Sequence, residues 1–196
     1  SHFCSAERQY RTPLEYGGQR SPTAQWTVTG SGCLILAREG QGPYVTHVTT
    51  GKIVDKGIKD AANMGAAMAP AAYSTIAPHF QDTGRKPSDY DLIVTGDLGK
   101  LGRDIVADWF HRDGMDLKNL TDCGTLIYDL EGQDVHCGGS GCGCSAVVLA
   151  GFLLDGMKQG RWRRILFCGT GALLSPTSSQ QGESIPSICH AVALDI

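Results

Sequence analysis

Residues 138–171, GGSGCGCSAVVLAGFLLDGMKQGRWRRILFCGTG, contain a glycine-rich turn, a long apolar run and a strand-like stretch, in that order. The run at 145–160 is hydrophobic nearly all round, which is the pattern of a helix that is buried on several sides. The stretch at 163–171 has the composition of a strand. A buried helix that leads into a buried strand is typical of layered α/β proteins, so this segment indicates the fold class.

The same two patterns recur on both sides of this segment. Strands are predicted at 32–37, 44–53, 91–96 and 187–196, with a weaker one at TLIYDL, 125–130. Helices are predicted at 64–80 and 101–114, and Pro78 is expected to break or kink the first of them. We therefore expect an α/β domain at 31–196 with helices on the faces of a sheet, preceded by a connecting loop region at 1–30.

Composition limits the classes of function. Of 196 residues, 41% are hydrophobic and 19% are charged, which suffices for a buried core. The 17 basic and 20 acidic residues give a net charge of −3, which argues against nucleic acid as a partner. No apolar run reaches the roughly 18 to 20 residues of a transmembrane helix, and no signal peptide is recognisable, so neither a membrane span nor secretion is expected.

The eight cysteines lie mostly in apolar or glycine-rich stretches, at positions 4, 33, 123, 137, 142, 144, 168 and 189. A disulfide framework is typical of secreted domains that are short and rich in loops, and this chain is neither short nor rich in loops. We predict that most of these cysteines are reduced, buried thiols that pack as small hydrophobic side chains.

The stretch 134–144 allows several readings. Its C-x4-C-x-C spacing does not match the paired ligands of a zinc site, and C-x-C would close a strained ring, so no metal and no redox pair are expected. Cys142 could be a nucleophile at a helix N-terminus, with His136 or His190 as its base. Otherwise the stretch is a crowded strand-to-helix turn whose backbone N–H groups could face an anion.

Two further features suggest ligand binding. Arg8 and Arg11 lie in a glycine-bearing loop and could hold carboxylates in bidentate fashion, unless an Arg–Glu network simply fixes the loop. Asp97 follows the predicted strand 91–96, at the end where α/β sheets place their ligands, although a capping role explains it equally well.

Seven motifs together carry a family resemblance: AERQYRTPLEYGGQR, TVTGSG, NMGAAMAPAA, YDLIVTGDLG, DCGTLIY, GGSGCGCSAVV and TGALLSPTSSQQGESIPSICHAV. In this order they resemble the stage V sporulation protein AD family, nearly end to end. That family is a relative of the thiolases and ketoacyl synthases, so the resemblance implies a thiolase-like α/β fold of which this chain is the C-terminal half. Enzymes of that superfamily carry their nucleophilic cysteine in the first half. Their histidine after the strand of DLIV is replaced here by TGDL, with Asp97 nearby.

The resemblance also implies a ligand and partners. The family is associated with binding of dipicolinic acid, or of its calcium complex, and with its uptake into the developing spore together with the other SpoVA membrane proteins. A flat aromatic dicarboxylate requires donors at both carboxylates and an apolar slot for the ring. Nine residues are our candidates for ligand contacts, with no catalytic residue, metal or cofactor: Arg8, Tyr10, Arg11, Met68, Asp97, Gly139, Ser140, Gly141 and Cys142.

Three functions therefore compete. The first is a non-enzymatic dipicolinate-binding protein, which would lie in the sporulating cell or at the surface of the spore inner membrane. The second is an acyl-thioester condensing or hydrolysing enzyme that uses Cys142 or a cysteine of the missing half. The third is a structural adaptor of the membrane transport complex. In each case, half of a sandwich leaves apolar faces open, so we expect it to pack against the missing N-terminal half or a second copy.

Overall fold

The computed structural model describes residues 21–196. A five-stranded mixed sheet with the order β2-β7-β6-β3-β4 forms its centre. β3 is parallel to β4 and β6, whereas β7 is antiparallel to β6 and β2. Its strands are β2 (Tyr44–Thr49), β3 (Leu92–Thr95), β4 (Leu120–Asp122), β6 (Arg164–Ala172) and β7 (Ser187–Asp195).

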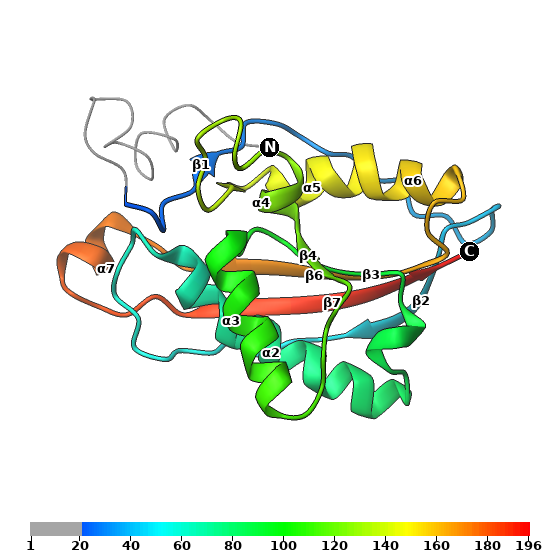
Figure 1. Ribbon diagram of the computed structural model, residues 1–196, viewed down its shortest axis with the longest axis horizontal. Coiled ribbons are helices and arrows are strands. Elements are labelled where there is room, and N and C mark those ends of the chain that lie inside the picture. Colours follow the sequence, from blue (N-terminus) through cyan, green and yellow to red (C-terminus); the bar gives the residue numbers. More distant parts are fainter. Residues whose placement is uncertain (1–20) are drawn as a thin grey trace.

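Helices cover both faces of this sheet (Figure 1). One face packs against α2 (Met64–Thr83) and α3 (Gly99–Arg112), and its core includes Ile76, Ile93 and Phe110. The other packs against a helical run made of α5 (Cys144–Val148), a π-helical segment η2 (Leu149–Leu153) and α6 (Leu154–Lys158). The α/β class predicted from the sequence is thus confirmed.

The shorter elements connect these layers. They are β1 (Trp26–Thr27), η1 (Pro87–Asp89), α4 (Cys123–Leu126), β5 (Gly139–Ser140) and α7 (Pro176–Gln180). β1 and β5 pair in parallel as a separate two-stranded sheet above the main one. None of the helices in residues 21–196 has the length and hydrophobicity that a bilayer crossing requires.

Several predicted elements differ from the structure. Helix α2 continues through Pro78, because buried side chains on both sides of it, Ile76 and Phe80, outweigh the loss of one backbone hydrogen bond. The predicted strand at 44–53 ends at Thr49. At Gly51 a Cβ atom would lie 1.6 Å from the Cys189 carbonyl oxygen, so the chain passes β7 at a distance that only glycine allows, and one isolated bridge follows at Val54.

Two other strand predictions were wrong. Residues 32–37 are not in a strand, because they have no ladder partner among the described residues; Ile35 is 91% exposed and Leu36 85%. The strand expected at 125–130 lies earlier, at β4. Asp122 ends it by accepting a hydrogen bond of 2.8 Å from the Gly124 N–H, which starts the short helix α4.

Candidate functional site

A cavity of about 450 Å³ lies along the carboxyl-terminal half of β6, next to the end of β3, and α/β sheets commonly place ligands at this end. Apolar side chains form most of its walls: Leu34, Met64, Met68, Leu149 and Phe167. Its polar groups are the side chains of Asp97, Ser140, Cys142, Ser145 and Thr170. Asp97 carries the one formal charge among the described lining residues. The cavity therefore combines an apolar slot with an acidic end.

Asp97 connects the end of β3 to the glycine-rich turn and to β6 by hydrogen bonds. β3 ends at Thr95, and two residues later one carboxylate oxygen of Asp97 accepts hydrogen bonds from the Ser140 hydroxyl, at 2.8 Å, and from the Gly141 N–H, at 3.2 Å. The other oxygen accepts from the Thr170 hydroxyl on β6, at 3.2 Å. The glycine-rich turn thus directs its donors toward a carboxylate of the protein itself.

A second carboxylate, Asp122, lies behind the first and was not identified from the sequence. It is fully buried and accepts hydrogen bonds from the Thr95 hydroxyl and from three backbone N–H groups, those of Leu98, Gly99 and Gly124. Burial raises its pKa to about 6, and the charge of Asp97 adds to this rise. Asp122 holds the start of α3 and hence the backbone that carries Asp97. The motif D-C-G-T, with a capping aspartate before a helical turn, is the signal that could have revealed it.

The thiols separate into two groups. Cys123, Cys137, Cys144, Cys168 and Cys189 are free and buried, so the prediction of reduced, packed thiols is confirmed for them. Cys33 and Cys142 are free and exposed, and Cys142 lines the cavity. Within residues 21–196, no three His, Cys, Asp or Glu side chains gather as a metal site.

No histidine lines the cavity in the part of the chain that the structure describes. His190, one candidate base for Cys142, accepts a hydrogen bond of 3.1 Å from the Gly51 N–H, and His136 lies 3.2 Å from the Asp134 carboxylate. Neither is among the residues around Cys142 in the cavity, so the nucleophile–base pair considered from the sequence is not assembled by these residues.

The structure thus brings together part of the predicted set. Met68, Asp97, Ser140, Gly141 and Cys142 line one cavity. Gly139 lies beside it and its carbonyl accepts a hydrogen bond of 2.9 Å from the Gln25 side chain. Arg8, Tyr10 and Arg11 lie outside the described residues. The ligand-binding role of all nine remains a prediction.

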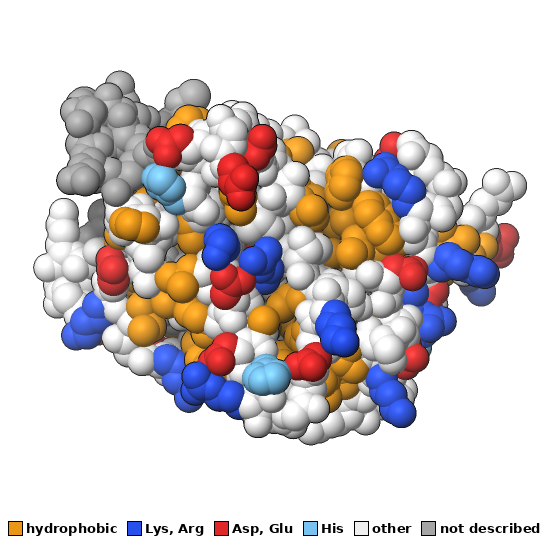
Figure 2. Space-filling model, in the orientation of Figure 1, with side chains coloured by type: hydrophobic (Ala, Val, Ile, Leu, Met, Phe, Trp, Pro, Cys, Tyr) orange, Lys and Arg blue, Asp and Glu red, His pale blue; other side chains and the backbone are white. Residues whose placement is uncertain are grey.

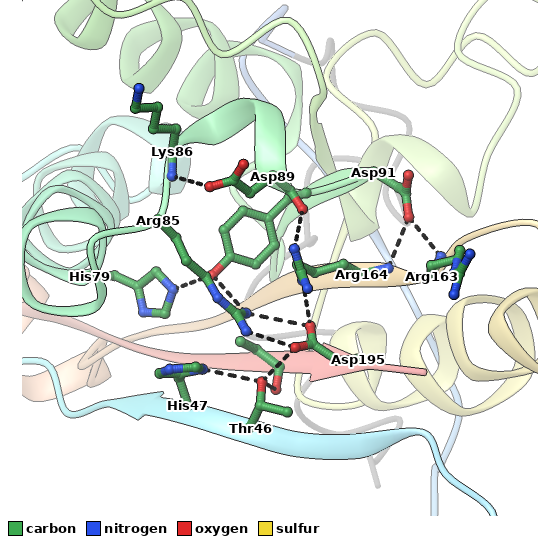
Figure 3. Close-up of polar contacts among 12 residues, drawn as sticks. Thr46, His47, His79, Arg85, Lys86, Asp89, Asp91, Arg163, Arg164 and Asp195 are labelled. Atoms are coloured by element: carbon green, nitrogen blue, oxygen red, sulfur yellow. Dashed lines mark hydrogen bonds and ion pairs between the residues drawn. The ribbon is translucent and has the colours of Figure 1, made fainter.

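Polar groups at the other end of the sheet have a structural task (Figure 3). Asp195 at the end of β7 binds Arg85 at 2.7 Å and Arg164 at 2.9 Å. Buried His79 bonds the Thr49 hydroxyl at 2.7 Å and the Tyr90 hydroxyl at 2.6 Å. This cluster joins α2 to the edge of the sheet. On the face shown in Figure 2, basic and acidic side chains are interspersed, without a continuous basic patch.

Comparison with known proteins identifies the family. The model of stage V sporulation protein AD (SpoVAD) matches residues 1–195 of this chain. The chain belongs to this family. It is 48% identical over 196 residues to stage V sporulation protein AD of Bacillus subtilis (strain 168), and it spans 58% of that relative's length. A sporulation protein family is therefore established for this chain, as the sequence motifs indicated.

Solved structures that are similar to this chain include two bacterial enzymes. One is 3-oxoacyl-[acyl-carrier-protein] synthase III from Aquifex aeolicus VF5, with a TM-score of 0.42 and 10% identity. The match covers 80% of this chain and 46% of the chain of that enzyme. The other is 3-oxoacyl-(acyl carrier protein) synthase III from Pseudomonas aeruginosa PAO1, with a TM-score of 0.41 and 13% identity. The match covers 81% of this chain and 47% of the chain of that enzyme.

Proposed function

We propose that this chain is the ligand-binding part of a non-enzymatic protein that binds dipicolinic acid or its calcium complex for uptake into the developing spore. The supporting observation is the cavity at the carboxyl ends of β3 and β6, whose apolar walls and polar end suit a flat ring with polar substituents. Its volume of about 450 Å³ lies in the range of small-molecule sites.

The charge of the site favours one form of the ligand. Free dipicolinate has two carboxylates, which the carboxylate of Asp97 repels at short range. The calcium complex is neutral and places a cation near the polar end. Alternatively, Arg8 and Arg11 supply the positive charge that the described lining lacks. Calorimetric titration with and without calcium, on the full-length protein and on an Arg8→Ala, Arg11→Ala double variant, separates these two routes.

Dipicolinate that fails to bind in either form contradicts the proposal. Binding that requires calcium in the unchanged protein supports recognition of the complex. Binding without calcium that the double variant loses supports recognition by the arginines.

The competing enzyme function has one observation in its favour, the exposed thiol of Cys142 inside the cavity. Incubation with acyl-CoA followed by mass spectrometry tests it, with Cys142→Ser as the matched control. We expect no acyl adduct on Cys142, because no histidine base adjoins it among the described residues. An adduct that the serine variant lacks would favour the enzyme.

We further propose a peripheral location at the spore inner membrane, beside the other SpoVA membrane proteins. An adaptor without ligand affinity predicts co-purification with those proteins but no heat of binding on addition of dipicolinate.

A further inference from the structure

One wall of the cavity carries few side chains. Phe167, Gly169 and Gly171 lie two residues apart on β6 and therefore point to the same face of the sheet. All three line the cavity. Beyond the ring of Phe167, this face of β6 is bare backbone.

Packing among the described residues does not require these two glycines. A Cβ atom at Gly169 would lie 3.9 Å from its nearest neighbours, the His190 carbonyl oxygen and the Phe167 ring. At Gly171 the nearest atom is a methyl group of Ile188, also at 3.9 Å. Both distances are ordinary van der Waals contacts, and neither glycine has a positive φ. A larger residue would thus fit the strand itself.

Gly96, one strand away, shows the contrast. A Cβ atom there would lie 2.5 Å from the Thr170 hydroxyl and 2.8 Å from the Ser145 hydroxyl, so close packing explains that glycine. Glycine in a strand interior weakens the strand, because it loses more backbone entropy on folding and packs no side chain. At Gly169 and Gly171, close packing among residues 21–196 does not explain why the chain has the less stable glycine.

We infer that the backbone of Gly169–Gly171 is the floor of the binding cavity, on which a planar ring lies flat beside Phe167. A glycine within a strand often marks a place where a ligand approaches the backbone closely. The apolar side chains of Leu34 and Leu149 line the same cavity, and Asp97 and Ser140 lie at its polar end. The floor makes the site selective for planar rings over puckered rings of equal charge. In its choice of ligand the inference rests on the proposed function.

The test uses valine, which suits a strand and fills the space above the floor. Gly169→Val and Gly171→Val are compared with Gly40→Val, a matched control at a glycine with nothing within 4 Å of its Cβ position. In the full-length protein with calcium present, we expect both floor variants to lose at least tenfold in dipicolinate affinity. Their urea midpoints should stay at or above that of the unchanged protein. Gly40→Val should alter neither quantity.

Three probes separate this inference from the proposed function: dipicolinate, the saturated analogue cis-cyclohexane-1,3-dicarboxylate, which has a puckered ring and the same charge, and quinoline, a flat ring without carboxylates. Dipicolinate should bind at least tenfold more tightly than the saturated analogue. Equal dipicolinate affinity in the unchanged protein and the valine variants contradicts the inferred role of the glycine floor but not the proposed function.

Two further outcomes complete the test. If the protein binds quinoline but not dipicolinate, and Gly171→Val abolishes the quinoline binding, the proposed function is wrong but the inferred role of the glycine floor is supported. Absence of all binding overturns both. If a valine variant has a lowered urea midpoint, Gly171→Ala replaces it, and affinity that alanine leaves unchanged counts against the floor.

Discussion

The carboxylate of Asp97 accepts a hydrogen bond of 2.8 Å from the hydroxyl of Ser140, forty-three residues further along the chain. This contact joins the end of β3 to the glycine-rich turn before α5, and so closes the polar end of the cavity. The same carboxylate reaches Thr170 on β6. Three segments therefore meet at one side chain.

Removal of that side chain should loosen the site. We expect Asp97→Ala to lower the free energy of unfolding by about 1–3 kcal/mol, because it leaves the buried Ser140 hydroxyl and the half-buried donors of Gly141 and Thr170 without this acceptor. Urea denaturation measures this. Asp104→Ala, which removes an exposed carboxylate of α3, should change stability by less than about 0.5 kcal/mol. Equal effects of the two substitutions would show that the Asp97 contacts do not stabilise the fold.

Asp122 should make stability fall with rising pH. Burial raises its pKa from 3.8 to about 6, so between these values the folded protein keeps a proton that the unfolded chain has lost. At 1.36 kcal/mol per pKa unit, this group lowers the free energy of unfolding by about 2 kcal/mol between pH 4 and 6, because the two pKa values lie near the ends of that window. Asp122→Asn should remove this contribution, so that the variant gains stability relative to the unchanged protein as pH rises from 4 to 6, measured by urea denaturation at several pH values; an unchanged pH dependence contradicts the assignment.

His79 should make stability rise with rising pH, which is opposite to the effect of Asp122. Burial lowers its pKa from 6.5 to about 4, and the nearby His47 and Arg85 add to this shift. Between these values the unfolded chain binds a proton that the folded protein does not, so stability is lost as pH falls from 6.5 toward 4. The slopes of His79 and Asp122 thus oppose each other. His79→Gln should unmask a fall in stability from pH 4 to 6, whereas Asp122→Asn should unmask a rise over the same window.

Arg11 is predicted to contact a ligand carboxylate. A charge-assisted hydrogen bond is worth about 1.5–3 kcal/mol, so Arg11→Ala should weaken dipicolinate binding by roughly ten- to a hundredfold in the full-length protein. Isothermal titration calorimetry measures the difference, and Arg38→Ala, at an exposed position, serves as the control. Identical affinities for the Arg11 variant and the unchanged protein would remove Arg11 from the site.

The exposed apolar side chains predict association of the isolated chain. Ile35 is 91% exposed, and Val48, on the edge strand β2, is 63% exposed. Edge strands and apolar patches of this kind attract a partner. We expect sedimentation velocity to show oligomers that the Ile35→Lys, Val48→Lys double variant reduces and the control Gln41→Lys does not. A purely monomeric chain of unchanged sequence is the opposite result.

Local patterns in the sequence were sufficient for much of the fold. The apolar run at 145–160, the helix predicted at 101–114 and the strand predicted at 91–96 correspond to the helical run α5–η2–α6, to α3 and to β3. Each of these depends on a periodicity within one segment. The strand expected at 32–37 failed because a strand needs a partner, and local composition carries no record of whether one is present.

The α/β class, the family and the position of Asp97 at the end of a strand could be predicted from the sequence, because they depend on short motifs and periodic side chains. Only the packing of the layers shows that Asp97 binds Ser140 and Thr170, that Asp122 is buried near it, and that a Cβ atom at Gly169 or Gly171 would meet no close contact. Those relationships join residues from different elements, or depend on the space above a strand. They are set by how the layers pack, which no single stretch of the chain encodes.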